Sequence, residues 1–208
     1  MRKTSKRLCV AVVAVVLLAL VAPCSGDDAA QHIKQGDAFL KNHNTAKAIA
    51  EFRAAVDSNP DSVEAHKKYI RATQESYLAA SGFSKAANFE ELRKRMDGAY
   101  AAADAKLRVT YETWAQQHPD KAVYQWALGT LWRGDSEKSQ QYFSRALALD
   151  PNFAPAAESL GNVAEMCGDE TEADKYFSQA AAADPKDIEA QFRYVETFEN
   201  TDLKNTAP

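Results

Sequence analysis

The apolar residues of this chain recur at steps of three and four residues over most of its length, which is the spacing of one face of an α-helix. The longest unbroken stripe consists of Phe89, Leu92, Met96, Tyr100, Ala103, Leu107, Tyr111 and Trp114. It predicts an amphipathic helix of about 30 residues, or about 45 Å. Asn88, with Glu91 three residues later, has the pattern of a cap for this helix, and a start nearer Ser84 is also compatible with the stripe.

Four stretches of the chain repeat one order of small and aromatic residues, and three of the copies are clear. In each clear copy a glycine comes first, an aromatic residue and an alanine follow, and a proline ends the stretch. The copies contain Gly36, Phe52, Ala55 and Pro60; Gly129, Phe143, Ala146 and Pro151; and Gly161, Phe177, Ala180 and Pro185. A period of about 34 residues is typical of a helical array in which each unit is one pair of helices.

The repeated glycines and prolines have a physical interpretation. A glycine inside a helix costs about 1 kcal/mol relative to alanine, so its return at the same phase of each copy needs a packing reason. We expect the second helix of each pair to approach the glycine closely, with Phe52 and Phe177 filling the space between the helices. Because proline forces the preceding residue out of helical geometry, Pro60, Pro151 and Pro185 mark the ends of the second helices. The sequence therefore predicts an all-α protein.

The same residues resemble the tetratricopeptide repeat, whose pattern is Leu-Gly, an aromatic residue, Gly-Asp, alanine, an aromatic residue, alanine and Asp-Pro. Residues 154–185 meet nearly all of this pattern, and residues 29–60 meet most of it, with His43-Asn44 in place of Gly-Asp. The resemblance implies an α-solenoid of antiparallel helix pairs over residues 29–199. It divides the chain into repeats at about 29–62, 63–121, 122–153 and 154–187, a capping helix at 188–199 and a flexible tail at 200–208.

The second repeat is longer than the others, since Pro60 and Pro119 stand 59 residues apart, against 34 between Pro151 and Pro185. We interpret it as a repeat whose two helices are each lengthened by roughly three turns, so that they project beyond the stack as a helical hairpin. A degenerate repeat followed by an extra short helix is the alternative. Gly98 is a point at which the long helix could bend.

The chain after residue 185 carries only the first half of a repeat. Its apolar residues are Ile188, Phe192, Tyr194, Val195 and Phe198. Because the last pair of a repeat array leaves its core open on one side, we expect this helix to cover that end.

The first 24 residues have a different pattern. Basic residues up to Arg7 precede an uncharged apolar run from Leu8 to Ala22, which is shorter than the roughly 20 residues that span a bilayer. A basic start before such a run is typical of an export signal, with a retained single-pass anchor as the alternative. Residues 21–24 resemble the cleavage box of bacterial lipoproteins, which implies lipidation of Cys24 and a place in the periplasm or on the envelope membrane. Cleavage near Gly26 without a lipid is the other possibility.

Composition and motifs argue against several classes of function. Residues 24–208 carry 21 basic and 29 acidic side chains, and this acidic balance disfavours nonspecific binding to nucleic acid or to anionic lipid. The sequence has no phosphate-binding loop, dinucleotide-binding, zinc-protease, Cys-x-x-Cys or serine-hydrolase motif, so we expect no enzyme activity and no cofactor. Its histidines are scattered, which predicts packing roles rather than a metal site, and Cys167 is expected to be an unreactive, half-buried thiol.

The resemblance also implies a binding site, because the first helices of such repeats line a concave groove that binds peptides. Carried onto this chain, the groove positions are Lys67, Arg71, Trp126, Asn162, Phe192 and Arg193. The position of Trp126 depends on the reference residue, since counting back from Pro151 rather than from Gly129 would bury it. The three cations favour a partner with acidic residues or a free carboxylate.

We therefore expect a non-catalytic adaptor that binds a protein or peptide partner, and no nucleic acid, in a bacterial cell envelope. The contact is either the groove or the tip of the projecting hairpin, around residues 81–92. An accessory subunit that holds clients for a thiol-redox or cytochrome-maturation enzyme is the alternative function.

Overall fold

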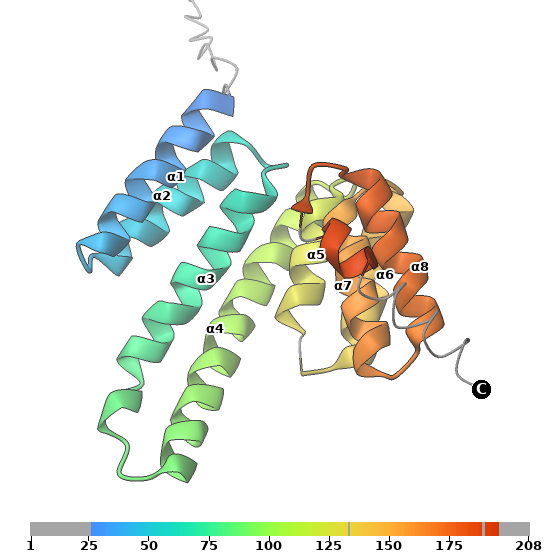
Figure 1. The fold of residues 1–208 in the computed structure, drawn as a ribbon. Coiled ribbons are helices and arrows are strands. Elements are labelled where there is room, and N and C mark those ends of the chain that lie inside the picture. Colours follow the sequence, from blue (N-terminus) through green and yellow to red (C-terminus); the bar gives the residue numbers. More distant parts are fainter. Residues whose placement is uncertain (1–25, 133, 189, 196–208) are drawn as a thin grey trace, which may run out of the picture.

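The computed structural model describes residues 26–132, 134–188 and 190–195. The predicted export signal, Cys24 and the chain after residue 195 lie outside the described residues. Within them every regular element is a helix, which confirms the predicted all-α class (Figure 1). The elements are α1 (Gly26–Lys41), α2 (Thr45–Ser58), α3 (Val63–Ala80), the short 3-10 helix η1 (Phe83–Lys85), α4 (Phe89–Gln117), α5 (Ala122–Leu131), α6 (Ser136–Leu149), α7 (Ala154–Met166) and α8 (Glu170–Ala183).

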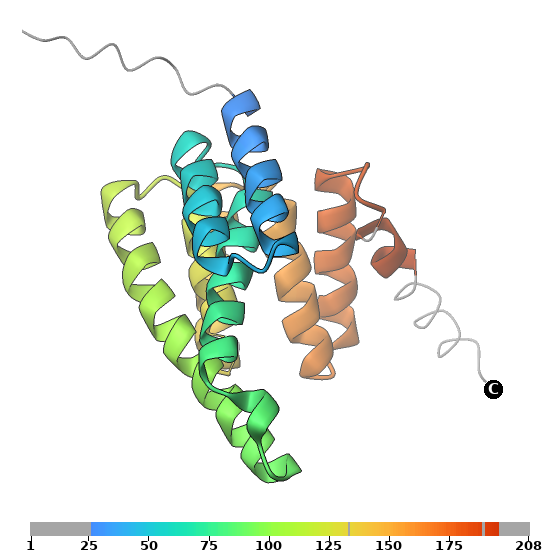
Figure 2. The same ribbon diagram turned by 90° about the vertical axis from the view of Figure 1, so that its left-hand side faces the viewer.

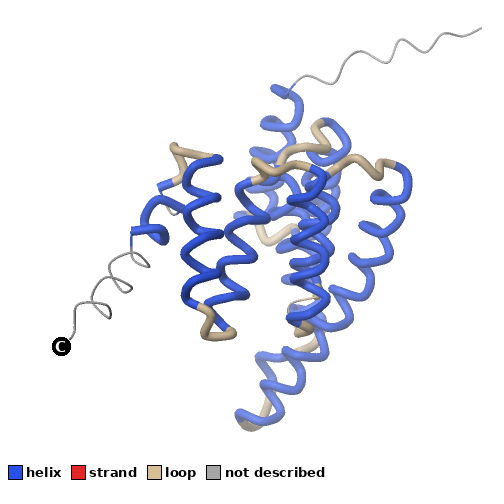
Figure 3. Tube along the Cα trace, turned by 90° about the vertical axis from the view of Figure 1, so that its right-hand side faces the viewer, coloured by secondary structure: helices blue, strands red, loops and turns tan. Residues whose placement is uncertain are grey.

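Each α-helix packs against the next one along the chain, most extensively within the pairs α1–α2, α5–α6 and α7–α8. The pairs follow one another as an array, with α3 and α4 standing between the first pair and the last two (Figure 1). Figure 3, seen from the side opposite to that of Figure 2, shows that the loops are short and join helix ends. One continuous core runs from Ala48 in α2 to Leu160 in α7, so the array is stabilised by burial between neighbouring helices.

The repeated glycines lie where a partner ring covers the first helix of each pair. A Cβ atom at the glycine would come within 2.4, 2.4 and 2.7 Å of the ring in the pairs Gly36–Phe52, Gly129–Phe143 and Gly161–Phe177. Real Cβ atoms essentially never make contacts that short, so only glycine allows the second helix to pack at this distance. The predicted packing reason for the glycines is thereby confirmed.

The helix ends also follow from the repeated residues. The second helices α2, α6 and α8 stop two residues before Pro60, Pro151 and Pro185. In the first repeat His43 takes the left-handed conformation, with φ of 56°, and Asn44 accepts a hydrogen bond from the backbone N–H of Lys47. His43-Asn44 thus makes the turn that the family pattern assigns to Gly-Asp.

Helices α3 and α4 are the two arms of a hairpin that reaches beyond the pairs on either side (Figures 1 and 2). They contain 18 and 29 residues, and α4 continues through Gly98. Asn88 caps α4 by accepting a hydrogen bond of 2.9 Å from the backbone N–H of Glu91, as predicted. The apolar stripe of α4 is buried from Ala103 onward, whereas Phe89 at the far end is 78% exposed, because this end lies outside the stack.

A polar contact joins the two arms of the hairpin inside the protein. Gln74 of α3 donates a hydrogen bond of 2.6 Å to the carboxylate of Asp104 in α4, and both residues are buried. Burying a carboxylate and an amide is costly unless they are hydrogen-bonded, so this contact favours one register of α3 against α4.

The end of the array is covered by some of the residues that follow α8. Residues 190–195 are helical, but Ile188, Phe192 and Val195 face solvent, whereas Ala190 is buried against Ala157 and Ala180. The flank of α7 and α8 beside Ala190 is lined by alanines, and the small side chain of Ala190 fits against them. Tyr194 also packs against the buried residues Ala164, Ala173 and Phe177, so this helix covers part of the end of the array. Phe198 of the predicted stripe lies outside the described residues.

Two further properties of the described residues bear on function. Cys167 is exposed rather than half-buried, because it lies at the end of α7, where the chain turns toward α8. None of the described helices combines the length and the apolar character that crossing a bilayer requires.

Candidate functional site

The first helices of the array, α1, α3, α5 and α7, enclose two hollows between neighbours. A hollow of about 580 Å³ lies between α1 and the start of α3, and a smaller one of about 240 Å³ lies between α5 and α7, with the start of α6 as its third wall. The resemblance to the tetratricopeptide repeat implies that these four helices line the concave groove. We therefore call their shared surface the groove, and the two hollows are its two ends. A hollow of several hundred cubic ångströms is large enough to admit side chains of a peptide.

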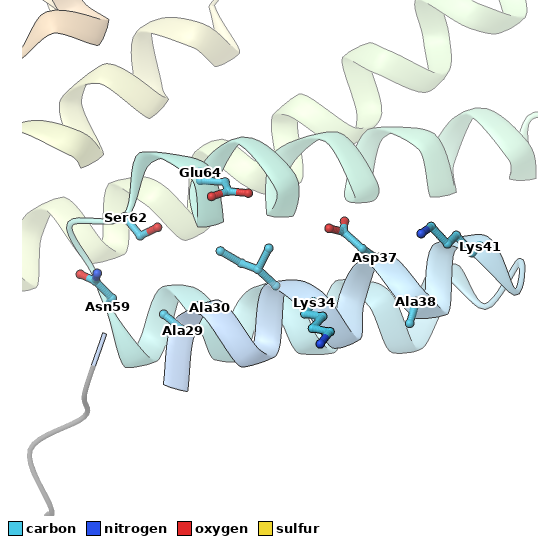
Figure 4. A pocket seen from close by; sticks show the side chains of 10 residues that line it. Ala29, Ala30, Lys34, Asp37, Ala38, Lys41, Asn59, Ser62 and Glu64 are labelled. Carbon is cyan, nitrogen blue, oxygen red and sulfur yellow. The ribbon is translucent and has the colours of Figure 1, made fainter. Parts of the chain in front are cut away.

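The α1–α3 end of the groove is charged (Figure 4). Lys34, Asp37 and Lys41 come from α1, and Glu64 comes from the first turn of α3. Asp37 accepts hydrogen bonds of 2.8 and 2.9 Å from Lys68 of α3, which ties the two helices together. The exposed ammonium groups of Lys34 and Lys41 have no ion pair with any described residue, so their charge is available to a partner.

The α5–α7 end is mostly apolar and contains one oriented amide. Val163 and Met166 line it, and Met166 is 84% exposed at its rim. The carbonyl oxygen of Asn162 accepts a hydrogen bond of 3.0 Å from Arg193. This leaves the NH₂ group of Asn162, which also lines the hollow, without a partner in the described part of the chain. The arrangement offers a hydrogen-bond donor beside an apolar surface.

Arg193 has a supporting position rather than an exposed one. Its guanidinium contacts Asn162, donates a 2.5 Å hydrogen bond to Glu165, and lies 4.9 Å from the ring centre of Phe177. Glu165 already neutralises the charge of Arg193, and a direct contact of Arg193 with a partner stays a prediction. Arg193 also holds the last helix against α7 and orients the Asn162 amide.

Arg71 and Lys67 lie on the exposed side of α3. The Arg71 side chain is 81% exposed and donates to Glu75 at 2.8 Å, and this hydrogen bond raises the pKa of the guanidinium above its ordinary value. Lys67 is exposed, and its ammonium lies 5.9 Å from the ring centre of Trp126 in α5. Lys67 therefore bridges α3 and α5 across the groove while keeping its charge in solvent.

Trp126 is a buried residue of the stack. It is 4% exposed, its indole N–H donates to Ser159 of α7 at 3.1 Å, and its ring meets Phe153 edge-on. The assignment of Trp126 to the binding surface is therefore wrong, and the phase counted back from Pro151 is the correct one. Phe192 is 64% exposed, and its neighbour Arg193 contacts α7 through Asn162.

The predicted positions are nevertheless linked across the array. Lys67 contacts Trp126, Trp126 binds Ser159, and Asn162 on the same helix as Ser159 binds Arg193. Sequence reasoning missed Lys34, Lys41, Val163 and Met166, which line the two hollows. Their signal was weak because an exposed lysine or a single apolar residue at a helix end is common on any surface.

The buried histidine of the array has a structural role. The ring of His66 is fully buried and bonds the backbone carbonyl of Pro60 and the hydroxyl of Tyr111, each at 2.9 Å. A carbonyl can only accept, so Nε2 carries the proton and Nδ1 accepts from Tyr111. Burial lowers the pKa of His66 from 6.5 to about 4, which keeps the ring neutral. No group of three or more His, Cys, Asp or Glu residues is placed to hold a metal within the described ranges.

Comparison with known proteins supports the repeat assignment. The family model described as Tetratricopeptide repeat matches residues 33–73 and 124–188. No curated protein sequence resembles the chain closely enough to count as a relative.

Solved structures resemble the chain only distantly. One is a crystal structure of MamA protein, with 17% identity, coverage of 87% of this chain and 86% of that one, and a TM-score of 0.47. Another is a thermophilic TPR protein of Thermus thermophilus, with 18% identity, coverage of 82% of this chain and 98% of that one, and a TM-score of 0.46. At these scores the fold assignment rests on the family match and on the helix pairs themselves.

Proposed function

The chain belongs to the tetratricopeptide repeat family, and from this premise we propose that it is a non-catalytic scaffold that binds a protein or peptide partner along the groove of α1, α3, α5 and α7. Repeats of this family are protein-interaction modules. In this chain the residues that line the two hollows indicate where the partner binds and which chemical groups the partner presents.

The observation that carries the proposal is the amide of Asn162 beside the apolar hollow. Arg193 occupies its carbonyl oxygen, so its NH₂ group is directed to donate elsewhere. A peptide backbone offers carbonyl groups that accept such a bond, and Val163 with Met166 offers a surface for one apolar side chain. Because the hydrogen bond between Arg193 and Asn162 exists before a partner arrives, the amide is already oriented when the peptide binds.

The other end of the groove suits an acidic partner. Lys34, Lys41 and Lys67 are exposed and have no ion pair within the part of the chain that the structure describes. Lys68 and Arg71 add less, since Asp37 and Glu75 already neutralise them. We therefore expect a peptide with acidic residues over α1 and α3 and an apolar residue at the α5–α7 end, bound more weakly as salt is added.

The proposed location is the bacterial cell envelope, and its support is the pattern of residues 1–24 alone. Mass spectrometry of the mature N-terminus tests it. A diacylglyceryl group on Cys24 supports a lipid anchor, and a start at Ser25 or Asp27 supports a periplasmic form. An intact Met1 in the membrane fraction contradicts both and favours a retained anchor.

Binding in the groove is tested with a partner captured from envelope extract and identified by mass spectrometry. Asn162→Ala should weaken its binding about fivefold to tenfold, because the amide donor is lost. Asn152→Ala, in the exposed turn between α6 and α7, is the matched control and should bind normally. Equal affinities of wild type and Asn162→Ala contradict the proposal. A partner that is itself a thiol oxidoreductase or a cytochrome-maturation enzyme would support the client-holding function.

A further inference from the structure

The free end of the hairpin, residues 81–95, is a surface with its own character, and we call it the hairpin tip. It extends past the neighbouring pairs and lies at the opposite end of the molecule from the start of α1 (Figures 1 and 2). Nothing in the described array covers it, since only α3, η1 and the first turns of α4 meet there. What the hairpin tip presents is therefore available to a partner without rearrangement of the stack.

The backbone of the hairpin tip is held in one conformation by Arg95. Its guanidinium donates to the carbonyl oxygens of Ser81 and Gly82 at 3.3 and 3.0 Å, and to the carboxylate of Glu91 at 2.6 Å. The same carboxylate accepts a hydrogen bond of 2.8 Å from the backbone N–H of Ala87. Because these bonds lock the turn to the start of α4, the exposed side chains of the hairpin tip are presented on a rigid support.

The exposed side chains of the hairpin tip include one aromatic ring, three cations and a single carboxylate, that of Glu90. Phe89 is 78% exposed, and Arg93 follows it by four residues, which places both on one face of α4. Lys85, Arg93 and Lys94 are exposed and have no hydrogen bond or ion pair with any described side chain. They differ in this from Arg95, whose charge is neutralised by Glu91.

The charge of the hairpin tip is opposite to that of the rest of the protein. Residues 81–95 contain four basic and two acidic side chains, whereas the remainder of residues 24–208 contains 17 basic and 27 acidic ones. Charges farther apart than the Debye length, about 8 Å at physiological salt, are largely screened from each other. The acidic body therefore does not cancel the attraction of an anionic surface for the end of a hairpin whose longer arm spans about 44 Å.

We propose that the hairpin tip is a peripheral contact for an anionic lipid surface, in which Phe89 enters the boundary between headgroups and acyl chains while Lys85, Arg93 and Lys94 meet lipid phosphates. An aromatic ring flanked by unpaired cations is the combination that interfacial helices use. A stable protein interface buries about 800 Å² on each partner, whereas Phe89 is the one large apolar side chain that is strongly exposed within residues 81–95. Binding to a lipid surface needs contacts from only a few side chains. The net negative charge of the whole chain therefore does not decide whether the hairpin tip binds anionic lipid.

The test places a tryptophan at the hairpin tip of the full chain and measures its quenching by brominated lipid. Phe89→Trp is compared with Val109→Trp, an exposed position on the same helix about 30 Å away. Vesicles of brominated phosphatidylcholine mixed with phosphatidylglycerol should quench the added emission at position 89 and not at position 109. Vesicles without phosphatidylglycerol should quench neither. This comparison is local, so membrane binding through residues 1–24 does not imitate it.

Charge variants complete the test. The triple variant Lys85→Gln, Arg93→Gln and Lys94→Gln should lower the affinity for these vesicles, measured by the quenching at position 89, roughly hundredfold. Each cation near an anionic surface raises that affinity about fivefold. The triple variant Lys34→Gln, Lys41→Gln and Lys67→Gln removes the same charge from the groove and should leave the affinity for these vesicles unchanged. Equal quenching at positions 89 and 109, or equal effects of the two triple variants, overturns the proposal. A response at position 89 to soluble polyglutamate without quenching by vesicles overturns it in favour of an acidic protein partner.

Discussion

The ring of Phe177 lies so close to Gly161 that a Cβ atom on the glycine would come within 2.7 Å of it. Phe177 is fully buried, so its ring cannot move aside without opening the core. The equivalent glycines of the first and third repeats meet Phe52 and Phe143 in the same way. In each repeat the absent side chain therefore sets the distance between the two helices of the pair, and hence the geometry of the groove.

Replacing this glycine tests the contact. Gly161→Ala gains about 1 kcal/mol of helix propensity, but overpacking a core contact typically costs about 1–3 kcal/mol, so we expect net destabilisation. Gly98→Ala is the matched control, because nothing lies within 4 Å of a Cβ there, and it should stabilise by about 0.5–1 kcal/mol. Urea unfolding measures both. A shift in the same direction for the two variants would mean that the Phe177 contact does not determine the identity of residue 161.

Mild acid should destabilise the array through His66. Its pKa is 6.5 in the unfolded chain and about 4 in the folded one, so below 6.5 the unfolded state binds a proton that the folded state does not. The contribution of His66 to the free energy of unfolding is therefore complete above pH about 6.5. It falls by up to about 3 kcal/mol as the pH drops toward about 4. The unfolding free energy of His66→Gln should depend less on pH across this window. An identical pH dependence in both proteins would rule out His66 as the cause.

The two arginines predicted for the groove should behave differently when removed. Arg71→Ala should leave the free energy of unfolding nearly unchanged, since an exposed pair such as Arg71–Glu75 contributes little. Arg193→Ala should lower it by about 1 kcal/mol, because contacts with Glu165 and the Phe177 ring are lost, and should also weaken peptide binding by releasing Asn162. Thermal unfolding of the two variants, measured together, checks this. Equal stabilities would show that Arg193 does not hold the last helix.

The repeat fold was predictable because its determinants are local. A glycine, an aromatic residue and a proline at fixed distances specify one helix pair without knowledge of the rest, and His43-Asn44 shows that other residues can make the same turn. The long arm of the hairpin was equally predictable from its unbroken apolar stripe. In both cases the residues that indicate the structure lie within the segment that forms it.

The site was less predictable because it depends on contacts between repeats. Gly129 and Pro151 stand 22 residues apart, two fewer than Gly36 and Pro60, so the position of Trp126 depends on which of them is counted from. Only the packing of Trp126 against Ser159 and Phe153 decides between the two counts. Arg193 reads as a surface cation until Asn162 and Glu165, about 30 residues earlier, are placed beside it. Such partners are distant in the sequence, so the pattern within one repeat does not identify them.

Site-specific photo-crosslinking tests the central claim, that the groove binds the partner, most directly. A photoreactive residue in place of Met166, at the rim of the α5–α7 hollow, is compared with one in place of Leu149, an exposed residue at the end of the second helix α6. The account predicts a covalent adduct with the captured partner from position 166 and none from position 149. An adduct from position 149 without one from position 166 would contradict it.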